Sequence, residues 1–73
     1  MKPIKTETEE MKNGIINFLD QAGFMFYAYE IEQGFITCQH ALRLAQEIEY
    51  VFPDEAWVAA SHVWLDRAEY LEI

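Results

Sequence analysis

Apolar residues recur at helical spacing over most of the chain, and the first such run is the most regular. Its members are Met11, Ile15, Phe18, Leu19 and Ala22. This stripe predicts a helix over residues 7–22, because residues three and four positions apart share a helix face. Thr6 and Glu9 have the spacing of a capping box at its start, and Gly23 favours a left-handed stop at its end. Gly14 costs stability inside a helix and indicates a close contact there.

Two similar stripes follow in the second half of the chain. The first consists of Ala41, Leu44, Ala45, Ile48, Val51 and Phe52. The second consists of Trp57, Ala60, Val63, Trp64, Ala68 and Leu71. Thr37 is placed to cap the former helix and Pro53 to end it, because the residue before a proline is pushed out of helical geometry. Asp54 and Glu55 are placed to open the last helix at its positive end.

Residues 24–33 (FMFYAYEIEQ) allow two interpretations. Their aromatic density favours a strand, with Gln33 and Gly34 as the turn of a short hairpin over residues 24–37. The same segment also fits a helical stripe of Phe24, Tyr27, Ala28, Ile31 and Phe35. As a strand it would be apolar on both faces, which a two-stranded sheet in so small a protein could hardly cover. We therefore predict a single all-α domain of three or four short antiparallel helices over residues 1–73, with an α+β fold containing the hairpin as the alternative.

The apolar content exceeds what a domain of this size can bury. The chain has 73 residues, 52% of them hydrophobic, with five Phe, four Tyr and two Trp. A domain this small hides only roughly 60% of the surface that its unfolded chain exposes. Some large side chains are therefore expected at the surface or in an interface. That surplus would either close a homodimer or form a groove for another protein.

The charge balance narrows the class of partner. Thirteen acidic residues against five basic ones give a net charge of −8. Such a chain is not expected to bind nucleic acid directly, because affinity for a phosphate backbone comes from Lys and Arg. Anionic membrane surfaces are disfavoured on the same ground, and no stretch is apolar enough to span a bilayer. With a single cysteine and no signal peptide, the expected location is the cytoplasm.

The residues that could carry chemistry are few. Cys38, His40 and His62 are too few, and too weakly patterned, for a zinc site with three or four ligands. A nucleophilic thiol needs an electropositive setting, whereas acidic and apolar neighbours should raise the pKa of Cys38. The paired carboxylates look like the solvated faces of helices, and the three glycines are too scattered to cradle a phosphate. We expect no enzymatic activity, no metal and no cofactor.

A repeated pattern links the two halves of the chain. Phe24 and Trp57 lie 33 positions apart, and the same offset pairs Ala28 with Ser61 and Ile31 with Trp64. Over residues 24–73 this resembles a tetratricopeptide helical repeat, whose period is 34 residues. The second helix of that family and its terminating proline are matched in spacing by Ala41, Ala45, Ile48 and Pro53. The resemblance implies peptide binding in a concave groove, as in small bacterial adaptors and secretion chaperones, with the first helix as an added cap. The alternative is a helical bundle without repeats.

Two functional hypotheses follow from these observations. The first is a protein-binding adaptor, small chaperone or regulator that uses exposed aromatic residues. The residues expected to make the contact are Phe24, Tyr27, Tyr29, Phe35, Trp57 and Trp64. The second is an acidic inhibitor that imitates nucleic acid and blocks a basic DNA- or RNA-binding protein. Its expected surface consists of Glu47, Glu49, Asp54 and Glu55.

Overall fold

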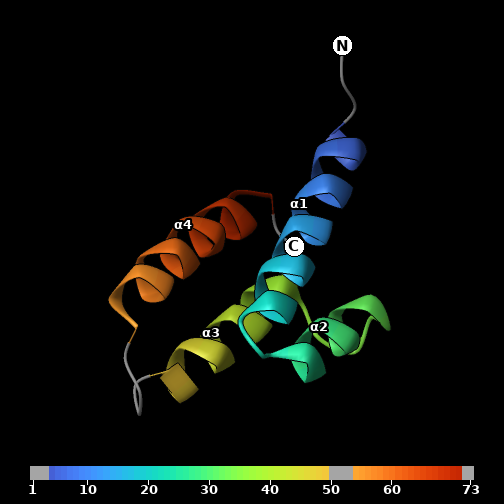
Figure 1. Cartoon of the computed structure of the whole chain (residues 1–73). Helices are drawn as coiled ribbons and strands as arrows, with labels where there is room; N and C mark the ends of the chain where they lie inside the picture. The colour runs from blue at the N-terminus through green and yellow to red at the C-terminus, as the bar shows by residue number, and fades with distance from the viewer. Residues whose placement is uncertain (1–3, 50–53, 72–73) are drawn as a thin grey trace.

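The computed structural model describes residues 4–49 and 54–71, with side chains for residues 8–48 and 54–71. Within these ranges every regular element is a helix (Figure 1). The helices are α1 (Ile4–Gln21), α2 (Met25–Glu32), α3 (Cys38–Glu49) and α4 (Glu55–Leu71). The all-α prediction is confirmed. The helical interpretation of residues 24–33 holds, and the alternative hairpin is not needed.

The first helix starts earlier than predicted and ends as predicted. It begins at Ile4, so Thr6 lies inside the helix, and the prediction of a capping box that starts at Thr6 is wrong. Nothing in residues 4–6 stops a helix from extending backward, since they include neither glycine nor proline. At the other end Gly23 adopts a φ of 94°, and the Phe24 N–H donates to the Leu19 carbonyl at 2.8 Å. This left-handed glycine turns the chain into α2.

The starts of α3 and α4 are fixed by side-chain caps, in line with the sequence prediction. The Thr37 hydroxyl accepts a hydrogen bond from the His40 N–H at 3.1 Å. The Asp54 carboxylate accepts one from the Trp57 N–H, also at 3.1 Å. Each cap pairs an amide that the helix itself leaves without a partner. Pro53, predicted to end the third helix, lies outside the described residues.

The helices pair as two hairpins. In Figure 1, α2 folds back against α1, and α4 returns alongside α3. Helix α1 also packs against α3 and α4, so it holds the two hairpins together. Helix α2 contacts α1 and α3 but not α4. The short α2 is therefore supported from one side, which leaves much of its surface in water.

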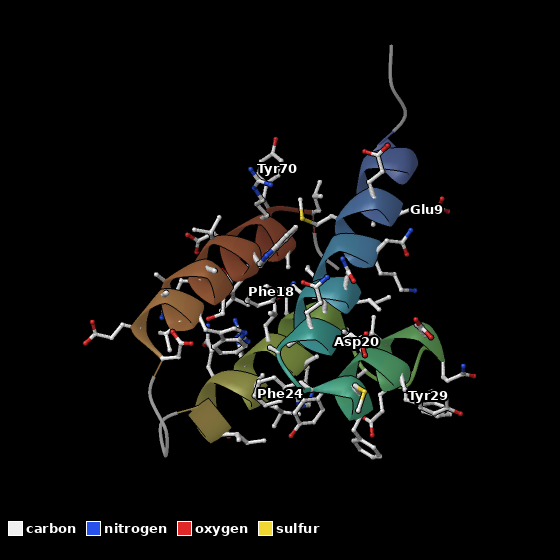
Figure 2. All side chains as sticks on the ribbon, in the orientation of Figure 1. Glu9, Phe18, Asp20, Phe24, Tyr29 and Tyr70 are labelled. Atoms are coloured by element: carbon white, nitrogen blue, oxygen red, sulfur yellow. The ribbon has the colours of Figure 1, made fainter. Side chains whose placement is uncertain are left out.

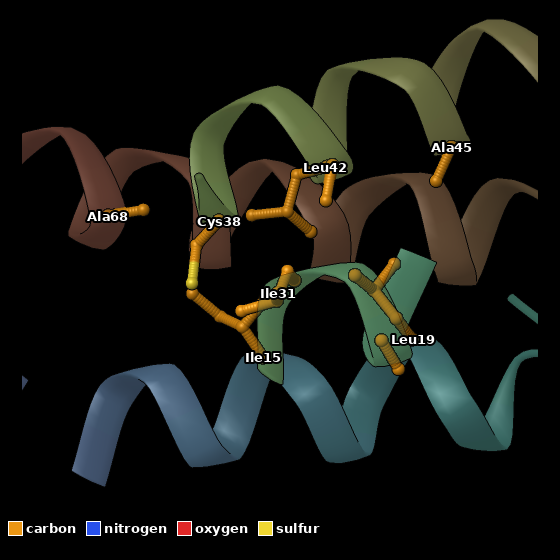
Figure 3. Packing of buried hydrophobic residues seen from close by; sticks show 9 residues of the cluster. Ile15, Leu19, Ile31, Cys38, Leu42, Ala45 and Ala68 are labelled. Carbon is orange, nitrogen blue, oxygen red and sulfur yellow. The ribbon is translucent and has the colours of Figure 1, made fainter. Parts of the chain in front are cut away.

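The core is built largely from small residues, which let the helix backbones approach closely. Its buried apolar members are Ile15, Leu19, Ala28, Ile31, Cys38, Ala41, Leu42, Ala45 and Ala68 (Figure 3). Ser61 is the buried polar residue among the described side chains, and it makes two hydrogen bonds. Its hydroxyl donates to the Val58 carbonyl at 2.7 Å and accepts from the Gln46 amide at 2.9 Å. Ser61 therefore lies in the core without an unsatisfied polar atom.

The packing corrects parts of the predicted stripes. Leu42 is fully buried although the predicted stripe of α3 omits it, whereas Ile48 is 48% exposed. Val63 in α4 is also exposed, whereas Ser61 of the same helix is buried. Leu42 is buried because α3 packs against three other helices and so buries a face wider than a single stripe. Val51 and Phe52 lie outside the described residues.

Gly14 makes the close contact that its position in α1 predicts. A β-carbon at this residue would lie 2.8 Å from Cη2 of Trp64 and 3.1 Å from its Cζ3. The indole of α4 therefore rests directly on the backbone of α1.

Candidate binding surface

A row of aromatic rings runs through the molecule and joins three of the helices. Phe18 of α1 stacks on Trp57 at 5.3 Å between ring centroids and lies 6.1 Å from Trp64. Trp57 in turn lies 5.4 Å from Phe24, and Phe24 stacks on Tyr27 at 6.0 Å. These spacings fall in the favourable range for aromatic pairs. The aromatic row is thus a structural feature that ties α4 to α1 and to the start of α2.

The structure divides the six predicted contact residues into two groups. Phe24, Tyr27, Trp57 and Trp64 belong to the aromatic row, are half-buried and pack against the core. The other two are exposed, Tyr29 by 54% and Phe35 by 71%. The structure therefore does not bring the six together on one open surface. The two exposed residues lie on α2 and in the segment that follows it.

Among the described residues, α2 carries more exposed large apolar side chains than any other helix. Met25 is 65% exposed and Phe26 is 70% exposed, and both neighbour Tyr29 at helical spacing. We call these three residues the α2 face. In Figure 2 the Tyr29 side chain extends from α2 at the edge of the molecule. Met25 and Phe26 were missed by the sequence prediction. The available signal was that five of the eight residues of this helix are large and apolar, while a short helix can bury only one side.

A groove between α1 and α2 borders the α2 face. From α1 it is lined by residues that share one helix face, Asn13, Ile16, Asn17 and Asp20. From α2 it is lined by Met25, Ala28, Tyr29 and Glu32, and its volume is about 450 Å³. A shallower extension of about 250 Å³ continues past Glu32 to Glu9 and Lys12. We call this the α1–α2 groove; its lining combines apolar side chains with the amides of Asn13 and Asn17 and the carboxylates of Asp20 and Glu32.

A second hollow lies between α1 and α4. Its volume is about 630 Å³, and its apolar lining includes Met11, Trp64 and Leu71. Tyr70 at its edge is 87% exposed and projects from α4 in Figure 2. Arg67 lies over the Trp64 ring at 6.0 Å from the guanidinium carbon to the ring centroid.

The predicted acidic surface has one member with a structural role. Glu47 and Glu55 are exposed, and Asp54 is exposed but caps α4. The side chain of Glu49 lies outside those described. Elsewhere Glu69 accepts a hydrogen bond from Arg43 at 2.6 Å, which links α4 to α3. The inhibitor hypothesis for this surface stays a prediction.

The side chains that could carry chemistry do not converge. Among the described residues, no three His, Cys, Asp or Glu side chains gather in a way that could hold a metal ion. Burial raises the pKa of the Cys38 thiol, and the nearby charge of Lys12 opposes this in part. The predicted direction is confirmed, although burial and not acidic neighbours is the cause. A buried, protonated thiol is a poor nucleophile.

Within the described part of the chain, no helix has the length and apolar character needed to cross a membrane. Comparison of the chain with known protein families, characterised proteins and solved structures gave no significant match.

Proposed function

We propose that this chain is a non-enzymatic protein-binding module, of the adaptor, small-chaperone or regulator type, whose contact surface is the α2 face together with Phe35. The observation that carries the proposal is the exposure of three large apolar residues on one helix that is covered from one side only. Exposed apolar patches rimmed by polar residues mark interaction sites in soluble proteins. Aromatic anchors such as Phe26 and Tyr29 are common among the residues that dominate interface energetics.

Magnitudes favour this surface over the acidic one as the source of affinity. An aromatic side chain brings about 150–250 Å² of surface, so Phe26, at 70% exposure, leaves on the order of 100 Å² in water. Burying that area stabilises a complex by about 2.5 kcal/mol before the costs of association. An exposed ion pair contributes about 0.2–1 kcal/mol. One anchor of the α2 face therefore outweighs two or three exposed carboxylates.

The resemblance of residues 24–73 to a tetratricopeptide repeat remains part of the proposal. Ala28 and Ser61, the small residues at matching positions of the two copies, are 4% and 0% exposed. Their burial supports a close helix approach at both positions, which is the physical purpose of a small residue there.

Site-specific photo-crosslinking in the native cells tests the proposal. A photoreactive phenylalanine analogue replaces Phe26 in one variant, Tyr70 in a second and Glu47 in a third. We expect a discrete crosslinked protein from position 26 and none from position 47, which is exposed but lies on α3. Crosslinking from Tyr70 alone would move the contact surface to the α1–α4 hollow. No crosslink at any of the three positions would contradict a protein-binding role.

A further inference from the structure

We propose that the α2 face and the α1–α2 groove bind a basic amphipathic segment of the partner protein. In this arrangement the apolar residues of the segment lie on the α2 face, and its Lys or Arg side chains lie beside Asp20 and Glu32. The inference rests on the proposed function and adds the chemistry of the partner. Three observations support it: the shape of the groove, the position of its carboxylates on the helices, and the cost of the competing dimer.

The groove presents apolar and acidic side chains in one lining. Ile16, Met25 and Tyr29 supply the apolar part, and Asp20 and Glu32 supply the carboxylates. Glu9 adds a carboxylate where the groove continues along α1, and Lys12 is the one basic residue in its lining. Figure 2 shows Asp20 near the middle of the molecule and Glu9 farther along the same helix. A partner with alternating apolar and cationic faces matches this lining, because complementary charge sets specificity and speeds association.

The carboxylates lie where they are unfavourable for their own helices. Asp20 is in the last turn of α1 and Glu32 is the last residue of α2. Neither last turn contains a basic residue. The C-terminal end of a helix carries partial negative charge, so cations stabilise it and carboxylates do not. A Lys or Arg from a partner would interact with the side-chain carboxylate and the helix end together.

The same charges disfavour a second copy of this chain as the occupant. A two-fold dimer uses one surface patch on both subunits. It would bring the Asp20 and Glu32 carboxylates of both subunits into one interface, between chains that each carry a net charge of −8. Like charges in an interface suppress such a pairing. A basic partner turns the same carboxylates into attractive contacts.

The test uses two synthetic amphipathic helical peptides of about 18 residues, long enough for roughly five turns. One carries Lys on its polar face and the other carries Glu at the same positions, with identical leucines. Affinity is measured by fluorescence anisotropy of the labelled peptide, and the contact surface is mapped by amide chemical shifts of the intact protein. We expect the Lys peptide to shift the amides of Asp20, Met25, Tyr29 and Glu32, and to bind more tightly than the Glu peptide.

Two double variants separate local from overall charge. D20N/E32Q neutralises the groove, whereas E47Q/E55Q removes the same charge from α3 and α4. We expect D20N/E32Q to lower the affinity for the Lys peptide about fivefold, which corresponds to the loss of two exposed ion pairs. E47Q/E55Q should change this affinity by no more than about twofold. D20N/E32Q should melt no lower than the unchanged protein, because it removes unfavourable charges from two helix ends.

Failure of the inference is distinguishable from failure of the proposed function. Equal affinity for the two peptides, equal losses in the two double variants, or a dimer that excludes the peptides would overturn the basic-partner inference. A third variant, Phe26→Ser, probes the apolar contact. Suppose that the basic-partner inference is overturned but Phe26→Ser lowers the affinity for both peptides. The α2 face then remains a binding surface for partners of other charge. If it changes neither affinity, the proposed function fails as well.

Discussion

Gly14→Ala provides the sharpest test of the packing between α1 and α4. In an isolated helix this change is favourable by about 1 kcal/mol, because glycine loses more backbone entropy than alanine. Here the new methyl group would lie 2.8 Å from Cη2 of Trp64, whereas carbon atoms in optimal contact are about 3.5–4.0 Å apart. The indole must therefore retreat by roughly 1 Å.

Trp64 has little freedom to make that movement. Its ring packs against Phe18 at 6.1 Å between centroids, and Arg67 covers it at 6.0 Å. Inserting a methyl group into such a contact costs about 1–3 kcal/mol. The cost exceeds the gain in helix propensity, so we expect Gly14→Ala to lower the free energy of unfolding by about 1 kcal/mol.

Trp64→Phe separates the two contributions. The clashing atoms belong to the six-membered ring of the indole, whose far edge a phenyl ring does not reach. In that background Gly14→Ala should become stabilising by about 1 kcal/mol, which gives a coupling energy of about 2 kcal/mol between the two positions. The assay is urea unfolding followed by circular dichroism at the helix band. Asn13→Ala, at an exposed position of the same helix, is the control that reports propensity alone.

Additive effects of Gly14→Ala and Trp64→Phe would contradict the contact between Trp64 and Gly14. If the two substitutions combine within about 0.5 kcal/mol of the sum of their separate effects, the indole does not rest on Gly14. A stabilising Gly14→Ala in the unchanged background would carry the same meaning.

Further predictions concern the caps, the buried hydroxyl and the buried thiol. Asp54→Ala should destabilise the protein by about 1 kcal/mol through loss of the cap on the Trp57 amide, while Asp54→Asn should retain most of the stability, as urea titration would show. Ser61→Ala should lower the free energy of unfolding by about 1 kcal/mol in the same assay, because the Gln46 amide loses its acceptor at 2.9 Å. An unchanged free energy of unfolding would mean that water replaces the lost acceptor. Because burial raises the pKa of Cys38 in the folded state, the folded protein holds the thiol proton more tightly than the unfolded chain. The contribution of this proton to the free energy of unfolding should be complete below the pKa of the unfolded thiol, about 8.5, and should fall as the pH rises above it. Cys38→Ala should abolish this fall.

The helices and most of their ends could be predicted from the sequence alone, because the signals for them are local. The all-α class, the left-handed stop at Gly23 and the caps at Thr37 and Asp54 follow from residues within a few positions of one another. Gly14 is also a local signal, since glycine inside a helix has few purposes other than close packing. The apolar surplus likewise indicated that large side chains would remain exposed, although not which ones.

The tertiary structure decided which side of each helix faces the core. Leu42 is buried because α3 packs against three other helices, and Phe26 is exposed because α2 is covered on one side only. The sequence of α2 could not distinguish these sides, because large apolar residues lie around most of its circumference. The candidate binding surface therefore depends on where α1 and α3 dock, and docking is set by contacts between residues far apart in the chain.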